Sequence, residues 1–98
     1  MSFTIIVTRD VQLRYRGFLA SIMLEIAPGT YVSPRLSPKA RDVVWDTVSG
    51  WHQILKRGSI TMVWRDTSAI GNVSLKILGD TRNELINIDD IILTRRSL

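Results

Sequence analysis

Cysteine is absent from this sequence and histidine occurs once, at His52, so several kinds of chemistry are excluded. A chain without thiols forms no disulfide, holds no thiolate zinc and has no cysteine nucleophile. A single histidine cannot provide a histidine pair for a metal. The chain also has no Walker loop, no glycine-rich dinucleotide turn and no Ser-His-Asp arrangement. Carboxylates and basic side chains remain as the candidates for function.

Long apolar runs are missing as well. No stretch approaches the ~20 residues that a membrane-spanning helix needs. Met1-Ser2 leads directly into an apolar segment without a basic region or a cleavage site, so we expect no signal peptide and a cytoplasmic protein. The 98 residues, 45% hydrophobic and 22% charged, predict a single domain over residues 1–98 with one core.

The net charge of +4 is unevenly distributed. Residues 1–41 hold six basic and two acidic residues, whereas residues 42–98 hold seven of each. A localised excess of positive charge indicates a polyanionic partner, and arginine suits phosphate better than loose electrostatic steering. A solvated basic face on a small domain is the alternative.

Hydrophobic patterns predict the elements of the N-terminal half. Residues 3–7 form a nearly continuous apolar run, with apolar side chains at odd and even positions, which predicts a strand buried on both faces. Apolar residues at 3, 4, 3 spacing then predict an amphipathic helix over residues 11–27, ended by Pro28-Gly29. Residues 30–33 predict a short strand that Pro34 limits, with Arg35 and Leu36 in the loop beyond it.

A second helix and further strands are predicted for the rest of the chain. Ser37 as N-cap and Pro38 at the first helical position open a helix that runs to about Lys56. The predicted buried stripe of this helix consists of Ala40, Val44, Val48, Trp51 and Leu55. Alternating patterns predict strands at residues 59–65 and 73–78, and a last short strand is predicted at residues 91–94, after Asp89-Asp90. In the second of these strands, the side chains expected to face inward are Val73, Leu75 and Ile77.

This order of elements predicts an α+β fold, a ferredoxin-like split βαβ sandwich. Its antiparallel sheet would carry two helices on one face and an extra C-terminal strand. Two helices cover only one face of a sheet, yet the first strand is apolar on both sides. A second copy of the chain is the simplest cover for the other face, and we therefore predict a homodimer.

Asp10 directly follows the first strand, and two interpretations of it stay open. Two Asp10 carboxylates facing each other across a dimer axis would hold a Mg²⁺ that activates water against a phosphodiester, making Asp10 both metal ligand and catalytic residue. Alternatively, Asp10 caps the helix that follows it. Arg9 beside it would compete with a cation.

Basic residues gather at the starts of both predicted helices. Arg14 and Arg16 lie in the first turns of one, and Arg35, Lys39 and Arg41 flank the start of the other. Helix starts favour anions through their free amides. Such contacts hold a nucleic-acid backbone without reading its sequence, so we predict duplex DNA as the partner.

The chain resembles the second CRISPR-associated core protein, in its type I-E branch. The resemblance covers almost all 98 residues and rests on IIVT followed by LRYRGFLA, on MLEIAPGTYVS, on SPKARDVVWDTVSG and on GSITMVW. It implies a ferredoxin-like homodimer that bridges two dimers of the CRISPR integrase, the first core protein. Such a complex captures foreign duplex DNA, the protospacer, and inserts it into the CRISPR array, and this scaffold role requires no cofactor.

The resemblance also implies roles for individual residues. Backbone contacts to DNA carry over to Arg14, Arg16, Lys39, Arg41 and Arg82, and integrase docking carries over to Ile91, Ile92, Leu93 and Thr94.

Other members of this family look like Mg²⁺-dependent endonucleases that act on RNA or DNA, with an acid at the end of the first strand. Here Arg9 stands where the branch usually has glutamate, and Asn83 replaces the second of two loop arginines. A non-catalytic scaffold is therefore the primary hypothesis. A nuclease that uses Asp10 from both subunits is the alternative.

Overall fold

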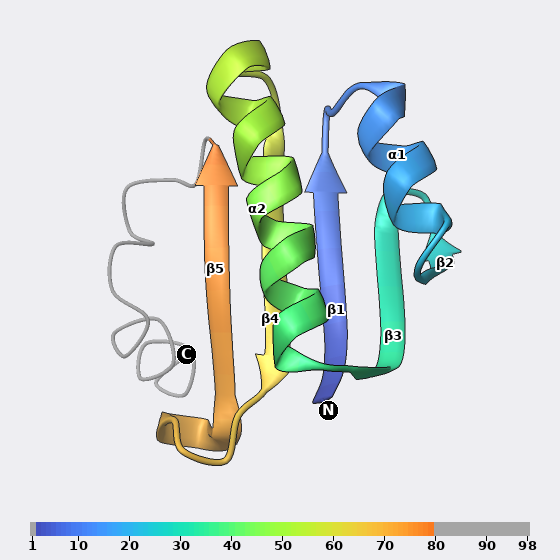
Figure 1. Ribbon diagram of the computed structural model, residues 1–98. Coiled ribbons are helices and arrows are strands. Elements are labelled where there is room, and N and C mark those ends of the chain that lie inside the picture. The colour runs from blue at the N-terminus through green and yellow to red at the C-terminus, as the bar shows by residue number, and fades with distance from the viewer. Residues whose placement is uncertain (1, 80–98) are drawn as a thin grey trace, which may run out of the picture.

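The strand β1 (Ser2–Arg9) lies in the middle of a five-stranded sheet (Figure 1). The computed structural model describes residues 2–79. After β1 the elements are α1 (Leu13–Ala20), β2 (Leu24–Ala27), β3 (Thr30–Leu36), α2 (Pro38–Leu55), β4 (Ser59–Arg65), the short 3₁₀ helix η1 (Ile70–Asn72) and β5 (Val73–Gly79).

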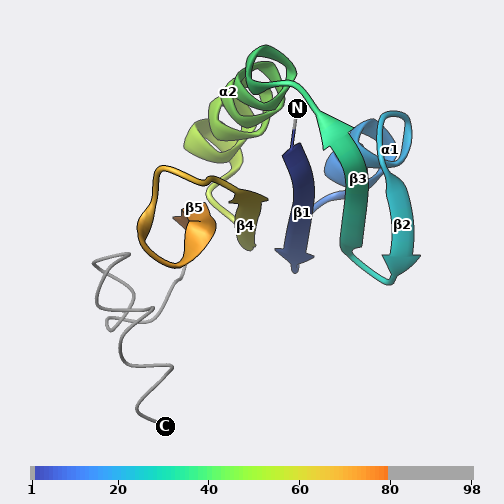
Figure 2. The same cartoon turned by 90° about the horizontal axis from the view of Figure 1, so that it is seen from below.

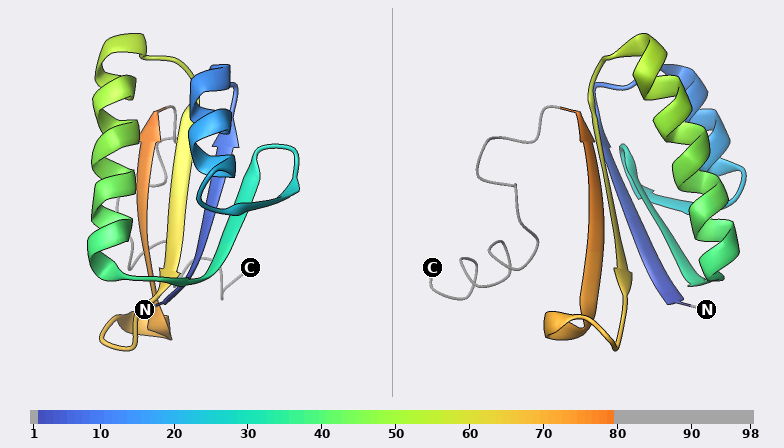
Figure 3. Two further views of the ribbon diagram at one scale, coloured as in Figure 1. Left: turned by 45° about the vertical axis from the view of Figure 1, so that its right-hand side comes forward. Right: turned by 60° about the vertical axis from the view of Figure 1, so that its left-hand side comes forward.

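The sheet order is β2-β3-β1-β4-β5, and every neighbouring pair is antiparallel. Both helices lie on the same side of the sheet (Figure 2 and Figure 3). The predicted α+β class, antiparallel sheet and two helices are confirmed, and the arrangement is compatible with a ferredoxin-like fold. The predicted strand at residues 91–94 lies outside the described residues. None of the helices within residues 2–79 is long and apolar enough to cross a membrane.

The hydrophobic core fills the space between the helices and the sheet. Its buried side chains come from both helices, from the three central strands and, at Met23, from the connection between α1 and β2: Ile6, Tyr15, Leu19, Met23, Tyr31, Val44, Val48, Ile60 and Met62. Trp45, Trp51 and Trp64 pack against this cluster and are only half-buried. The indole rings therefore serve the core and also reach the surface.

The predicted first helix is wrong in its second half. α1 ends at Ala20, and Leu24–Ala27 form the edge strand β2, which pairs with β3. Gly29 has a φ of +79° and so provides the tight turn between these two strands. In residues 24–27 the apolar spacing satisfies the helical period and the strand period alike, and the cross-strand pairing decides between them.

The third strand is longer than predicted, because β3 continues through Pro34 to Leu36. Placing Arg35 and Leu36 in a loop was therefore wrong. Pro34 lies where the register with β1 shifts, and it lies past the part of β3 that pairs with β2. A sheet tolerates proline where the strand pairing is irregular and where β2 does not pair with this part of β3.

The second helix agrees with its sequence signals. Ser37 caps α2, because its Oγ accepts a hydrogen bond of 3.1 Å from the Ala40 N–H. Lys56 ends the helix in the left-handed region with a φ of +48°. Val44 and Val48 of its predicted buried stripe belong to the core.

The predicted inward face of β5 is wrong. Met62 and Ile60 of β4 are buried against the helices, and they lie opposite Lys76 and Leu78 in the ladder. Directly opposed residues share a face of the sheet, so Lys76 and Leu78 face the helix side. The more apolar row of β5, which includes Leu75 and Ile77, consequently faces the other side. The register with β4, and not the composition of β5, sets its orientation.

The side of the sheet away from the helices is apolar. No element of residues 2–79 covers this side (Figure 2 and Figure 3). Val7 in the central strand is 43% exposed there. The cross-strand registers place on this side an apolar row that we call the open face: Ile5, Val7, Val32, Val63, Leu75 and Ile77.

Candidate nucleic-acid interface

Positive charge dominates the described part of the chain, where ten lysine and arginine residues face five acidic residues. Two of these acids form ion pairs, Glu25 with Arg16 and Asp10 with Arg57. Eight basic side chains of residues 2–79 therefore form no ion pair within that range. Unpaired cations at a surface are available to an anionic ligand.

The predicted basic residues form two clusters at opposite ends of the molecule. α1 begins at one end of the sheet and α2 at the other (Figure 1). Arg14 and Arg16 form the α1 cluster, and Arg35, Lys39 and Arg41 form the α2 cluster. The 18 residues of α2 make a helix about 27 Å long. The structure thus keeps the two groups apart by roughly the length of this helix.

Arg14 is held at the surface by an aromatic ring. Its guanidinium carbon lies 5.5 Å from the centre of the Trp51 ring, which α2 supplies. Trp51 is fixed in turn by edge-to-face contacts with Tyr15, at 5.2 Å, and Phe18, at 5.5 Å. A guanidinium over an indole keeps its charge and its N–H donors for a ligand.

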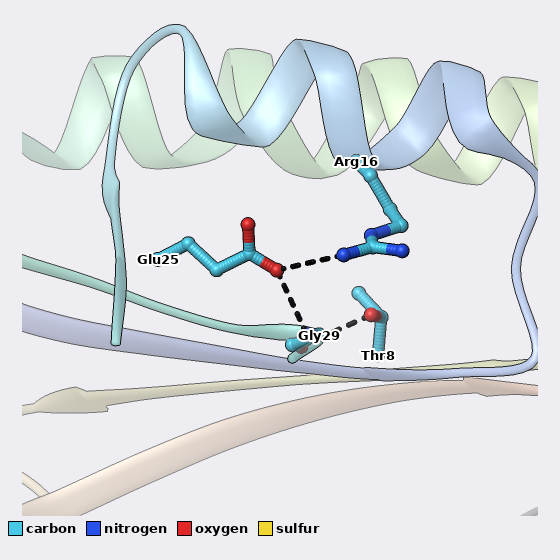
Figure 4. Close-up of polar contacts among 4 residues, drawn as sticks. All are labelled: Thr8, Arg16, Glu25 and Gly29. Atoms are coloured by element: carbon cyan, nitrogen blue, oxygen red, sulfur yellow. Dashed lines mark hydrogen bonds and ion pairs between the residues drawn. The ribbon is translucent and has the colours of Figure 1, made fainter. Parts of the chain in front are cut away.

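Arg16 is part of a polar chain that connects α1 with the sheet (Figure 4). Its Nη2 lies 3.2 Å from Oε2 of Glu25, and the same oxygen accepts a 3.0 Å hydrogen bond from the Gly29 N–H. Thr8 donates to the Gly29 carbonyl oxygen through its N–H and its hydroxyl. The Gly29 N–H and the Arg16 guanidinium lower the pKa of Glu25. Arg16 is therefore a positioned cation with one carboxylate partner.

Asp10 does not cap α1, so that alternative is wrong. The N-cap is Gln12, and Asp10 instead accepts hydrogen bonds from Arg57, 2.9 Å from Nη2 and 3.3 Å from Nε. Gly58 packs directly on the backbone of Asp10, and His52 Nε2 lies 3.3 Å from the Gly58 carbonyl oxygen. Residues 2–79 contain no group of three or more His, Cys, Asp or Glu side chains placed to hold a metal.

The α2 cluster borders an open hollow of about 610 Å³, whose lining includes Pro38, Arg41 and Trp64. The Arg41 guanidinium carbon lies 4.3 Å from the centre of the Trp64 ring. Asp66 also lines the hollow, and its carboxylate accepts hydrogen bonds from the Ser68 N–H and from the hydroxyls of Ser68 and Ser74. These bonds lower the pKa of Asp66. Its oxygens are thus engaged with serines.

Some contacts of the candidate site are not predicted by the sequence. Glu25 of β2 pairs with Arg16, and Arg57, which follows α2, pairs with Asp10. No sequence pattern connects these residues to their partners. The contacts between the tryptophan rings and basic side chains likewise join residues that are not neighbours in the sequence. The predicted contacts at Arg82 and at Ile91, Ile92, Leu93 and Thr94 lie outside the described residues.

The fold and the charge define a small basic α+β protein with arginines held in place at both ends of its helix layer. The chain matches the model of a family described as CRISPR-associated protein (Cas_Cas2CT1978) over residues 3–93. It belongs to this family, which agrees with the resemblance seen in the sequence. Membership implies a role in CRISPR adaptive defence.

Proposed function

We propose that this protein is a dimeric, non-catalytic scaffold that holds duplex DNA during spacer acquisition and bridges two dimers of the CRISPR integrase. The observation that carries the proposal is the pair of basic clusters, where most cations have no carboxylate partner. Their side chains suit phosphates, and nothing in them selects a base sequence. The scaffold itself needs no metal.

The two clusters fit a duplex better than a small anion. An α2 length of about 27 Å corresponds to roughly eight base pairs at about 3.4 Å each. A protomer with cations at both ends of this span would contact backbone phosphates at separate points. Contacts of this kind add to affinity and make it depend steeply on salt.

The open face supports the dimer. Its apolar row crosses four strands and remains in contact with solvent in one protomer. A second copy presents the same row, so a two-fold axis would bury both at once. Integrase docking by residues 91–94 and a DNA contact from Arg82 remain part of the proposal, supported by family membership.

The nuclease alternative has less support. Arg57 already neutralises Asp10 in each protomer, and a cation at this position would have to displace it. Mg²⁺-dependent cleavage by purified protein that disappears in Asp10→Asn would overturn the non-catalytic role.

The DNA-binding role is tested by comparing Arg14→Gln with Lys56→Gln, since each removes one positive charge. Fluorescence anisotropy with a blunt duplex should show weaker binding for Arg14→Gln. Its plot of log affinity against log salt should be shallower by about 1.8 for a dimer that loses two phosphate contacts. Lys56→Gln should change the slope less. If both variants had equal effects, net charge alone would explain the binding, and this result would contradict a defined interface.

A further inference from the structure

Each of the three tryptophans lies under a cation. Trp51 holds Arg14 and Trp64 holds Arg41, both within the proposed interface. Trp45 holds Lys76, whose Nζ lies 6.0 Å from the ring centre. Lys76 belongs to neither basic cluster, yet it is presented in the same manner.

Lys76 lies beside the α2 cluster. It is on β5 opposite the buried Met62, so it faces the helix side of the sheet, and its side chain is exposed. Trp45 comes four residues after Arg41 on α2, and residues at this spacing are neighbours on a helix surface. Through its contact with Trp45, Lys76 is therefore linked to the helix turn that follows Arg41, on the side of the molecule where α2 adjoins β5 (Figure 1).

Carboxylates do not neutralise Lys76 within the described residues. It forms no ion pair there, and Asp66, which lies near the start of β5, accepts hydrogen bonds from the hydroxyls of Ser68 and Ser74. Asp42 and Asp46 on α2 form no ion pair with it either. An ammonium restrained over an indole keeps donors for a ligand and loses less side-chain freedom on binding.

We propose that Lys76 is a further phosphate-binding residue, held in place by Trp45, which extends the α2 cluster along the α2–β5 side. The ligand is the sugar–phosphate backbone of duplex DNA, so this inference rests on the proposed function. Lys76 supplies the point charge and Trp45 positions it.

The contact is tested with Lys76→Gln in the full-length protein, using the duplex and the salt titration described above. A dimer that loses two phosphate contacts should give a slope shallower by about 1.8. Its affinity loss at low salt should clearly exceed that of Lys56→Gln, the control with the same charge change. Equal losses would overturn the proposal, because a loss of net charge would then explain them.

The positioning role needs a second variant. Trp45→Phe keeps an aromatic side chain but weakens the attraction to a cation, since indole is the best ring for this contact. We expect an intermediate loss of affinity, and no further loss when Trp45→Phe is added to Lys76→Gln. Additive losses would overturn the coupling between the two residues. Melting curves show whether each variant is folded, and only folded variants are compared.

The failure of this inference is distinguishable from the failure of the proposed function. Wild-type protein that binds duplex DNA and loses affinity in Arg14→Gln, but not in Lys76→Gln, rejects the role of Lys76 alone. Wild-type protein without salt-dependent duplex binding rejects both.

Discussion

At the scale of single residues, Gly29 joins structure to function most directly. It makes the turn between β2 and β3, and its N–H and carbonyl oxygen bond to Glu25 and Thr8. A Cβ at this position would lie 2.9 Å from the Thr8 carbonyl oxygen, and the φ of +79° disfavours any L side chain. Arg16, through Glu25, therefore depends on a glycine thirteen residues away.

We expect Gly29→Ala to lower the free energy of unfolding by about 1–3 kcal/mol, because it combines a strained φ with a close contact. Gly50→Ala is the matched control. Gly50 lies inside α2 with open space around its Cα, so alanine should raise stability there by up to about 1 kcal/mol. Urea denaturation of both variants measures the difference. A neutral Gly29→Ala would show that the turn accepts a side chain.

At the scale of elements, the Arg16–Glu25 pair fastens the edge strand β2 to α1. The pKa of Glu25 is lower in the folded protein, mainly because of the Gly29 N–H. The stability that its carboxylate contributes is fully present above the unfolded pKa of about 4.3, and it is lost as the pH falls through the folded value.

Glu25→Gln should therefore reduce the loss of thermal stability between pH 7 and about pH 3, the range that spans the unfolded pKa of glutamate. The variant should also melt below the wild type at pH 7. Asp46→Asn serves as the control, because Asp46 forms no hydrogen bond or ion pair within residues 2–79. Melting curves at both pH values give the result. Parallel acid profiles for wild type and Glu25→Gln would contradict a stabilising carboxylate.

The elements differ in how well their sequence predicts them. α2 carries its own signals, namely the Ser37 cap, Pro38 and the apolar stripe, and each acts within a few residues. β2 has no such local signal, because its state depends on pairing with β3. The orientation of β5 likewise depends on its register with β4. Local patterns cannot encode contacts that another strand decides.

The same distinction holds for the candidate site. Basic residues beside a helix start are visible in the sequence, so Arg14, Arg16 and Arg41 were found. Their partners lie elsewhere in the chain, with Trp51 on α2, Glu25 on β2 and Trp64 on β4. Only the packing of the helices on the sheet brings each cation to its partner.

At the scale of the whole molecule, the sheet separates a basic helix side from an apolar open face. A charge placed on the open face should prevent two copies from meeting there, since a buried unpaired charge is costly. Val7→Lys should therefore be a folded monomer, whereas wild type should be a dimer. Val43→Lys makes the same change at a 54% exposed position on α2 and should remain dimeric. Sedimentation velocity distinguishes these states, and a dimeric Val7→Lys would place the interface elsewhere.

The three half-buried indoles have a spectroscopic consequence. Trp45, Trp51 and Trp64 each lie next to a cation that we place at the DNA backbone. A phosphate that draws such a cation away, or that compensates its charge, changes the electric field at the ring. The protein therefore contains its own fluorophores at the proposed contacts, and removing one indole at a time would assign each change in emission to one region of the surface.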